Sequence, residues 1–176
     1  MIILKFLSNG IKIMKVALIS AFLMLIYSTV SFANLSDKMI AECQFDYDDF
    51  NFCSKENIEK YKHALATKQP NFDTDKLLLN VGIKDYVRFV AIDTKTGVVF
   101  PLNDAISGYT DSRNTRKEHP PIIDYSLNNK ELCVEGELYA YRDAYNHAKV
   151  CYAIQDRPES TFKKEFRRMS TPVEID

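Results

Sequence analysis

The clearest alternation of polar and apolar side chains lies between residues 130 and 154, KELCVEGELYAYRDAYNHAKVCYAI. Side chains of a strand point alternately to its two faces, so this pattern predicts a β-hairpin with one apolar and one polar face. With Cys133 opposite Cys151, the polar face pairs Glu135 with Lys149, Glu137 with His147 and Tyr139 with Tyr145, all favourable combinations. The apolar face then carries Leu132, Val134, Leu138, Val150 and Tyr152. A slip of one residue would exchange the two faces, so the pattern also predicts the register.

Four further stretches have the pattern of strands: residues 76–83, 86–93, 98–102 and 122–127. Residues 94–97 (TKTG) separate the second from the third, with Gly97 placed where a tight turn needs a positive φ. Pro101 cannot donate a ladder hydrogen bond, so the third stretch is expected at a sheet edge.

Helical patterns precede these strands. In residues 34–43, Ser36 is a candidate N-cap. In residues 54–67, Ser54 is a candidate N-cap, and Ile58, Tyr61 and Leu65 form an apolar stripe. A third, short helix is expected in the tail, where Phe162, Phe166 and Met169 would share a face. The predicted fold is α+β, with short N-terminal helices followed by an antiparallel meander of about five strands.

The first 33 residues have the pattern of an export signal. Three lysines precede or begin an apolar run over residues 16–30, and Ser31-Phe32-Ala33 offers small residues for cleavage. The run is shorter than the ~20 residues needed to span a bilayer, and Met14 is an alternative start to Met1. We therefore expect residues 34–155 to form one secreted domain, followed by a polar tail, residues 156–176.

All four cysteines lie after this signal, and an even number of cysteines in an oxidising compartment predicts two disulfides. Three pairings are possible from the sequence. The hairpin pattern favours Cys133–Cys151, which leaves Cys43–Cys53 by elimination. The expected location is the periplasm or the medium.

Composition and motifs argue against several classes of function. Without the three lysines of the signal, 20 basic side chains stand against 24 acidic ones, so nucleic acid is not an expected partner. The three histidines are scattered, and no phosphate-binding glycine loop, nucleophile elbow or zinc motif is present. We expect no enzyme activity, cofactor, metal or membrane anchor in the mature protein. A small secreted hydrolase stays an alternative, because carboxylates are abundant.

Two segments are candidate contact surfaces for another protein. One is the long polar connection of residues 103–121, in which Ser107, Tyr109, Asp111 and Arg113 could enter the cleft of a partner. The other is the segment between Cys43 and Cys53, in which Asp46, Tyr47, Asp48 and Asp49 could meet a basic rim. In the same segment, the aromatic side chains could instead pack into the core.

Ser107-Gly108-Tyr109 resembles the Ser-Gly-containing loop, ending in tyrosine, with which lysozyme inhibitors plug their target. The resemblance is confined to these three residues and assigns no family. Export without an anchor, a small rigid scaffold, and protruding polar and aromatic segments without catalytic residues lead to the hypothesis of a periplasmic inhibitor or immunity protein that neutralises a cell-wall-degrading enzyme or effector. The alternative is a structural or accessory envelope protein.

Overall fold

The computed structural model describes residues 35–46, 49–83, 86–110, 118–140 and 143–175. These ranges contain a 3₁₀ turn, one α-helix and twelve strands: η2 (Asp37–Met39), α2 (Lys55–Thr67), β1 (Lys76–Asn80), β2 (Tyr86–Val87), β3 (Phe89–Asp93), β4 (Val99–Pro101), β5 (Ala105–Ser107), β6 (Tyr109–Thr110), β7 (Glu118–His119), β8 (Ile122–Asp124), β9 (Leu132–Ala140), β10 (Asp143–Asp156), β11 (Lys164–Arg168) and β12 (Val173–Glu174). The predicted signal, residues 1–33, lies outside them. No helix within the described ranges is long and apolar enough to cross a membrane.

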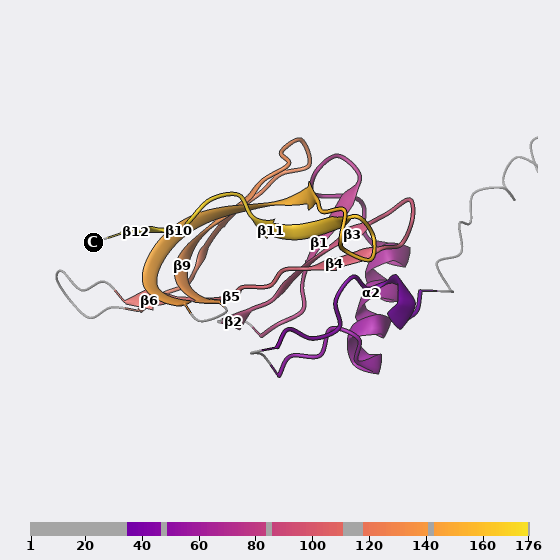
Figure 1. The fold of residues 1–176 in the computed structure, drawn as a ribbon, viewed down its shortest axis with the longest axis horizontal. Coiled ribbons are helices and arrows are strands. Elements are labelled where there is room, and N and C mark those ends of the chain that lie inside the picture. The colour runs from indigo at the N-terminus through magenta and orange to yellow at the C-terminus, as the bar shows by residue number, and fades with distance from the viewer. Residues whose placement is uncertain (1–34, 47–48, 84–85, 111–117, 141–142, 176) are drawn as a thin grey trace, which may run out of the picture. The chain divides into compact units, whose positions relative to one another are not determined.

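The strands form two main antiparallel sheets. The small sheet has the order β1-β3-β4, and the large sheet has the order β11-β10-β9-β5-β2, with β12 on the edge of β10 and β8 on the edge of β9. A separate ribbon pairs β6 with β7. Figure 1 shows α2 and the small sheet at one end of this unit and the curved β9–β10 hairpin at the other. The α+β class is therefore confirmed, with more strands than predicted and with the helix set between an extended N-terminal segment and the first strand.

The β9–β10 hairpin confirms the central prediction. Cys133 is paired with and bonded to Cys151, and Glu135 is paired with Lys149. The second predicted disulfide, Cys43–Cys53, is also present. All five predicted apolar positions of the hairpin are buried: Leu132, Val134, Leu138, Val150 and Tyr152.

The predicted register fails beyond Gly136 because β10 contains a bulge between Tyr145 and Ala148. Tyr145 pairs with Leu138 and packs against the main core, whereas the sequence pattern had placed it opposite Tyr139 on the polar face. His147, expected opposite Glu137, instead contacts Glu135, with 3.0 Å between Nε2 and Oε1. An extra residue in one strand exchanges the faces of all residues beyond it.

The chain forms two hydrophobic clusters. The larger one lies under the large sheet and includes Leu132, Leu138, Tyr152 and Phe166, and the smaller one includes Phe52 and Tyr61 under α2. The predicted cap of the helix is confirmed, since the Asn57 backbone N–H donates to Ser54 Oγ. Tyr61, in the predicted apolar stripe, is fully buried and donates its hydroxyl to the Phe52 carbonyl, 3.0 Å away.

The expected helix over residues 34–43 is wrong. Only the 3₁₀ turn η2 forms, and Ser36 makes no side-chain cap. The chain then extends, because Ile40 forms a parallel bridge with Val99 and the Ala41 N–H donates to the Val99 carbonyl. Bonding to the edge of β4 replaces the bonds that a continuing helix would have made. The edge position predicted for Pro101 is confirmed, since β4 ends the small sheet.

The expected helix in the tail is also wrong, because residues 164–168 form β11 on the edge of β10. Phe162 and Phe166 are four residues apart, a spacing that puts side chains on one face of a helix and equally on one face of a strand. The backbone groups of β10 over residues 152–156 need partners, and β11 supplies them. Met169 lies beyond β11 and is exposed.

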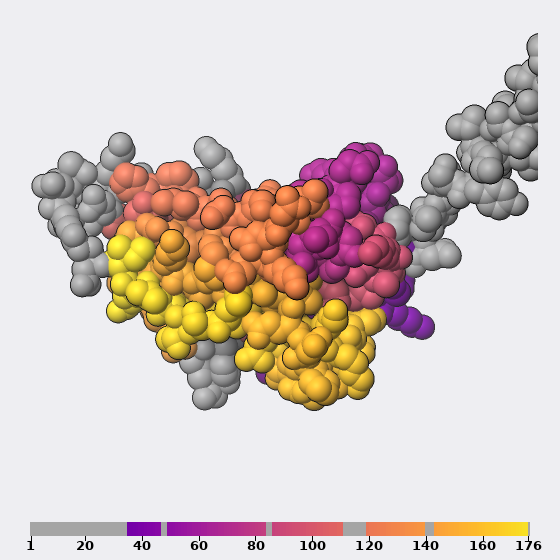
Figure 2. All heavy atoms as spheres, turned by 90° about the horizontal axis from the view of Figure 1, so that it is seen from above, coloured from indigo at the N-terminus to yellow at the C-terminus, as the bar shows by residue number. Residues whose placement is uncertain are grey.

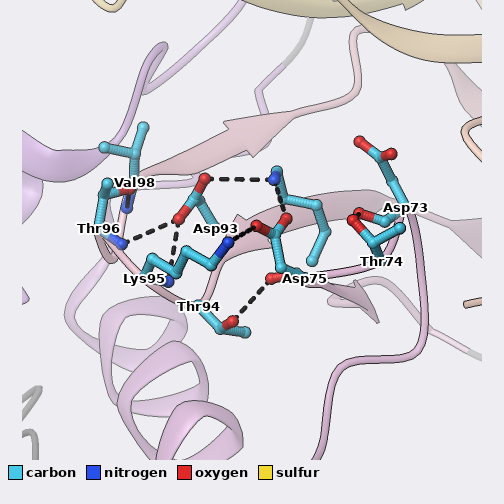
Figure 3. Close-up of polar contacts among 9 residues, drawn as sticks. Asp73, Thr74, Asp75, Asp93, Thr94, Lys95, Thr96 and Val98 are labelled. Carbon is cyan, nitrogen blue, oxygen red and sulfur yellow. Dashed lines mark hydrogen bonds and ion pairs between the residues drawn. The ribbon is translucent and has the colours of Figure 1, made fainter.

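A network of charges lies at one end of the β1–β3 pair, where Lys76 is paired with Asp93 (Figure 3). Lys76 contacts Asp75 and Asp93, and Lys95 Nζ lies 2.8 Å from Asp75 Oδ2. The Asp93 carboxylate also accepts backbone N–H groups of Lys95 and Thr96 across the turn. This turn ends in Gly97 at a φ of 77°, as predicted.

Candidate functional site

In the described residues of the long connection, 103–110 and 118–121, the chain forms short strands. Residues 105–107 form β5 on the edge of β9, and β6 and β7 follow as a ribbon. Ser107 and Tyr109 are therefore fixed on strands. The short apolar run Ala105-Ile106, buried beside Leu138, drives the pairing but is too brief to be recognised among polar neighbours.

The polar face of the large sheet brings Ser107 next to two residues from distant parts of the chain. Cross-strand pairing aligns Tyr86 of β2, Ser107 of β5 and Glu137 of β9. Directly opposed residues of an antiparallel pair have their side chains on the same face. Ser107 Oγ donates to Glu137 Oε2 at 3.1 Å, so a side-chain hydrogen bond joins β5 to β9 within this row.

Tyr139 completes this group. Its ring centroid lies 6.0 Å from that of Tyr86, and a hydrogen bond to the Glu137 carboxylate raises the pKa of its phenol above the ordinary value. Tyr86 and Tyr139 are 38% and 39% exposed. We name Tyr86, Ser107, Glu137 and Tyr139 the tyrosine cluster. Large, partly exposed aromatic side chains around a polar centre are typical of protein-contact surfaces.

Tyr109 joins the ribbon to the β9–β10 hairpin. Its ring stacks with the His147 ring at a centroid distance of 3.9 Å and with the His119 ring at 5.2 Å. His147 is held in turn by Glu135. The ribbon can start here only because Gly108 has no side chain, since a Cβ at that position would lie 2.2 Å from the His119 carbonyl oxygen.

Between Cys43 and Cys53, the described aromatic side chains pack into the core, as one of the two interpretations predicted. Phe52 is fully buried, with the ring centroid of Phe50 4.7 Å away and that of Phe45 5.8 Å away. The guanidinium of the buried Arg88 lies 5.3 Å from the Phe52 ring centroid. Asp46 and Asp49 are exposed. The predicted contact residues Tyr47, Asp48, Asp111 and Arg113 lie outside the described residues.

A second polar group, missed in the sequence, lines a cavity of about 260 Å³ between β11 and the β4–β5 connection. Tyr152 donates to the buried Asp104 carboxylate at 2.6 Å, and Arg168 Nε donates to the same oxygen. The Arg168 guanidinium also lies over the Tyr145 ring. Burial, followed by the Asp104 charge, raises the pKa of Tyr152 well above its ordinary value, so the phenol stays a proton donor to Asp104. Each charge of this group has a protein partner, as in a structural ion pair.

Potential metal ligands cluster at one place in the described part of the chain, where Glu131 lies close to Cys133 and Cys151. Both sulfurs are in the disulfide and cannot act as thiolate ligands. The chain matches no known protein family, no curated protein and no solved structure.

The predicted contact residues that the structure describes lie in three places. Ser107 lies in the tyrosine cluster, Tyr109 lies on the β6–β7 ribbon, and Asp46 and Asp49 lie on the Cys43–Cys53 segment. Tyr86, Glu137 and Tyr139 were missed as site residues. The available signal was the alternation in residues 130–154, because Glu137 and Tyr139 both belong to its polar face.

Proposed function

We propose that this protein binds another protein in the periplasm and neutralises it, the target being a cell-wall-degrading enzyme or effector. The observation that supports this proposal is the tyrosine cluster. Two tyrosines from different strands, Tyr86 and Tyr139, lie beside the Ser107–Glu137 hydrogen bond on the polar face of the large sheet. The two disulfides fit an oxidising compartment.

The chemistry of the cluster favours contact over catalysis. Tyrosine side chains bury much area with few rotatable bonds, which lowers the entropic cost of ordering them in a complex. Cross-strand pairing and the Tyr86–Tyr139 contact already orient these rings before a partner arrives. Such preorganised aromatic side chains are typical of residues that dominate the dissociation rate of a complex.

The test is a pull-down of the disulfide-bonded protein from envelope extract, with the Tyr139→Ala variant beside the wild type. Tyr125→Ala is the matched control, because Tyr125 is 37% exposed but lies after β8, outside the cluster. We expect Tyr139→Ala to lose a specific protein partner at least tenfold and Tyr125→Ala to retain it. The recovered partner should lose its peptidoglycan-degrading activity when the wild-type protein is added.

Two results would reject the proposal in different ways. Recovery of no protein partner by the wild type would favour the structural or accessory envelope protein. A partner whose binding ignores Tyr139 but falls on charge reversal at Asp46 and Asp49 would move the contact to the Cys43–Cys53 segment, since association driven by exposed charges is sensitive to charge reversal and salt.

A further inference from the structure

Two neighbouring rows of side chains cross the outer face of the large sheet. One row contains Asp124, the Cys133–Cys151 disulfide and Met169, whose N–H donates to the Cys151 carbonyl. The next row contains Ile122, Glu135, Lys149 and Val173, each paired with the next across the strands. We name these two rows the disulfide patch. Figure 2 shows that the C-terminal half of the chain, in orange and yellow, covers most of one side of the molecule.

The disulfide patch exposes three large apolar side chains on a sheet face. Ile122 is 51% exposed, Met169 is 49% exposed and Val173 is 65% exposed. The solvated face of an antiparallel sheet ordinarily carries polar side chains. Ile122 at one edge of the patch and Met169 and Val173 at the other are thus apolar side chains at positions where polar ones are expected, which indicates an interaction surface.

The order of charges within the second row indicates which partner fits. The row reads apolar, acidic, basic, apolar from β8 to β12, with Glu135 and Lys149 at its centre. This order is self-complementary about a two-fold axis that runs along the strands between β9 and β10. Such an axis would place Glu135 of one copy against Lys149 of the other, and Ile122 against Val173.

The first row follows the same logic. Arg167 is exposed on β11 and shares a strand face with Met169, two residues further on. The same axis would place Met169 opposite Asp124 of a second copy, with Arg167 one row further along the strands. A partner of a single sign would instead meet a like charge on one half of the patch, so the alternating signs favour a second copy of this chain.

We propose that the disulfide patch is the interface of a two-fold homodimer. This inference does not depend on the proposed function. Four strands about 4.8 Å apart and two side chains deep cover less than the ~800 Å² per partner of a standard interface. We therefore expect a weak dimer. The ribbon over His147 leaves Ile122, Met169 and Val173 exposed.

Sedimentation equilibrium of the disulfide-bonded protein up to about 1 mM tests the dimer at concentrations at which interfaces of this size associate. We expect the mean mass to rise toward that of two chains. Val173→Asp should weaken association at least tenfold. Leu127→Asp is the control, since Leu127 is also exposed but lies in the β8–β9 turn.

Exchanging the charges of Glu135 and Lys149 distinguishes a loss of dimer contacts from a loss of folding. Glu135→Lys leaves two basic centres in the row and Lys149→Glu leaves two acidic ones, so each variant alone should dissociate. An equimolar mixture of the two should form a heterodimer, because every central contact is then between opposite charges. A wild type that stays monomeric, or a mixture that does not associate more strongly than either variant alone, overturns the proposal.

Discussion

The Tyr109 ring lies parallel to the His147 ring, with 3.9 Å between their centroids and 8° between their planes. This contact joins the β6–β7 ribbon to a bulged position of β10, two elements that share no sheet. The ribbon therefore depends on side-chain stacking for its position rather than on a ladder of backbone hydrogen bonds to the large sheet.

Replacing His147 with Ala should free the ribbon while leaving the core folded. Stacked aromatic pairs contribute about 0.5–1.5 kcal/mol, so amide hydrogen exchange at Thr110 and Glu118 should accelerate roughly tenfold. Amides of the buried strand β3 should not change. His63→Ala is the control, because His63 is exposed on α2. Unchanged exchange at Thr110 in the His147→Ala variant would show that the stack does not hold the ribbon.

The disulfides should contribute unequally to stability. A cross-link restricts the unfolded chain more when it closes a longer loop. Cys133–Cys151 joins residues 18 apart and Cys43–Cys53 joins residues 10 apart. Replacing the first pair by Ser should lower the free energy of unfolding by about 2–5 kcal/mol. Replacement of the second pair should cost less, by about 0.5 kcal/mol in the loop-entropy term.

Chemical denaturation of the two double variants, beside the wild type, measures this difference. The order depends on the folded structure as well, because the Cys43–Cys53 bridge lies next to buried Phe52. A variant without Cys43–Cys53 that proves the less stable of the two would show that this local packing outweighs loop length.

The sequence predicted the parts of the fold in which one periodicity dominates. The hairpin over residues 130–154 alternates strictly as far as Gly136, and the structure has that register and its disulfide. The helix beginning after Ser54 has both its cap and its apolar stripe. These features depend on interactions between residues that are close in sequence or symmetrically placed across one turn.

The errors share a physical cause, since each depends on pairing with a distant strand. The tail became β11 because β10 is longer than β9 and needed a partner over residues 152–156. The tyrosine cluster was predicted only in Ser107, because Tyr86 reaches that residue through sheet order alone. The bulge at Asn146 and His147 could not be predicted from the sequence, because no glycine or proline lies there.

Acid should weaken the charge network of the small sheet. Hydrogen bonds from Lys76 and then Lys95 lower the pKa of Asp75 from 3.8 to about 2. Because the folded-state pKa is depressed, the network stabilises the fold fully above pH ~4 and loses this contribution as the pH falls toward 2. Asp75→Asn should therefore cost about 1–2 kcal/mol near neutral pH and much less at pH 2.

Urea denaturation of wild type and Asp75→Asn between pH 2 and 7 measures that difference. Asp124→Asn is the control, because Asp124 is exposed and makes no ion pair with another described residue. A difference between wild type and Asp75→Asn that stays constant with pH would rule out the lowered pKa as the source of the stabilisation.

The group of Asp104, Tyr152 and Arg168 allows the contribution of its ion pair to the free energy of unfolding to be predicted. Arg168→Met removes the only cation bonded to Asp104 among the described residues and leaves a buried carboxylate, which should cost about 3–5 kcal/mol. Tyr152→Phe removes one neutral donor and should cost about 1–3 kcal/mol. The two losses should not add, because both variants act on the same carboxylate oxygen.

The triple variant Asp104→Leu, Tyr152→Phe, Arg168→Met decides whether this group is needed for folding. Replacing a whole buried ionic group with apolar side chains of similar size is often neutral or stabilising, because no charge is left without a partner. We therefore expect thermal denaturation to show the triple variant more stable than Arg168→Met alone. If it is the less stable of the two, the Asp104–Arg168 pair contributes more than its desolvation costs, and the group is a net source of stability.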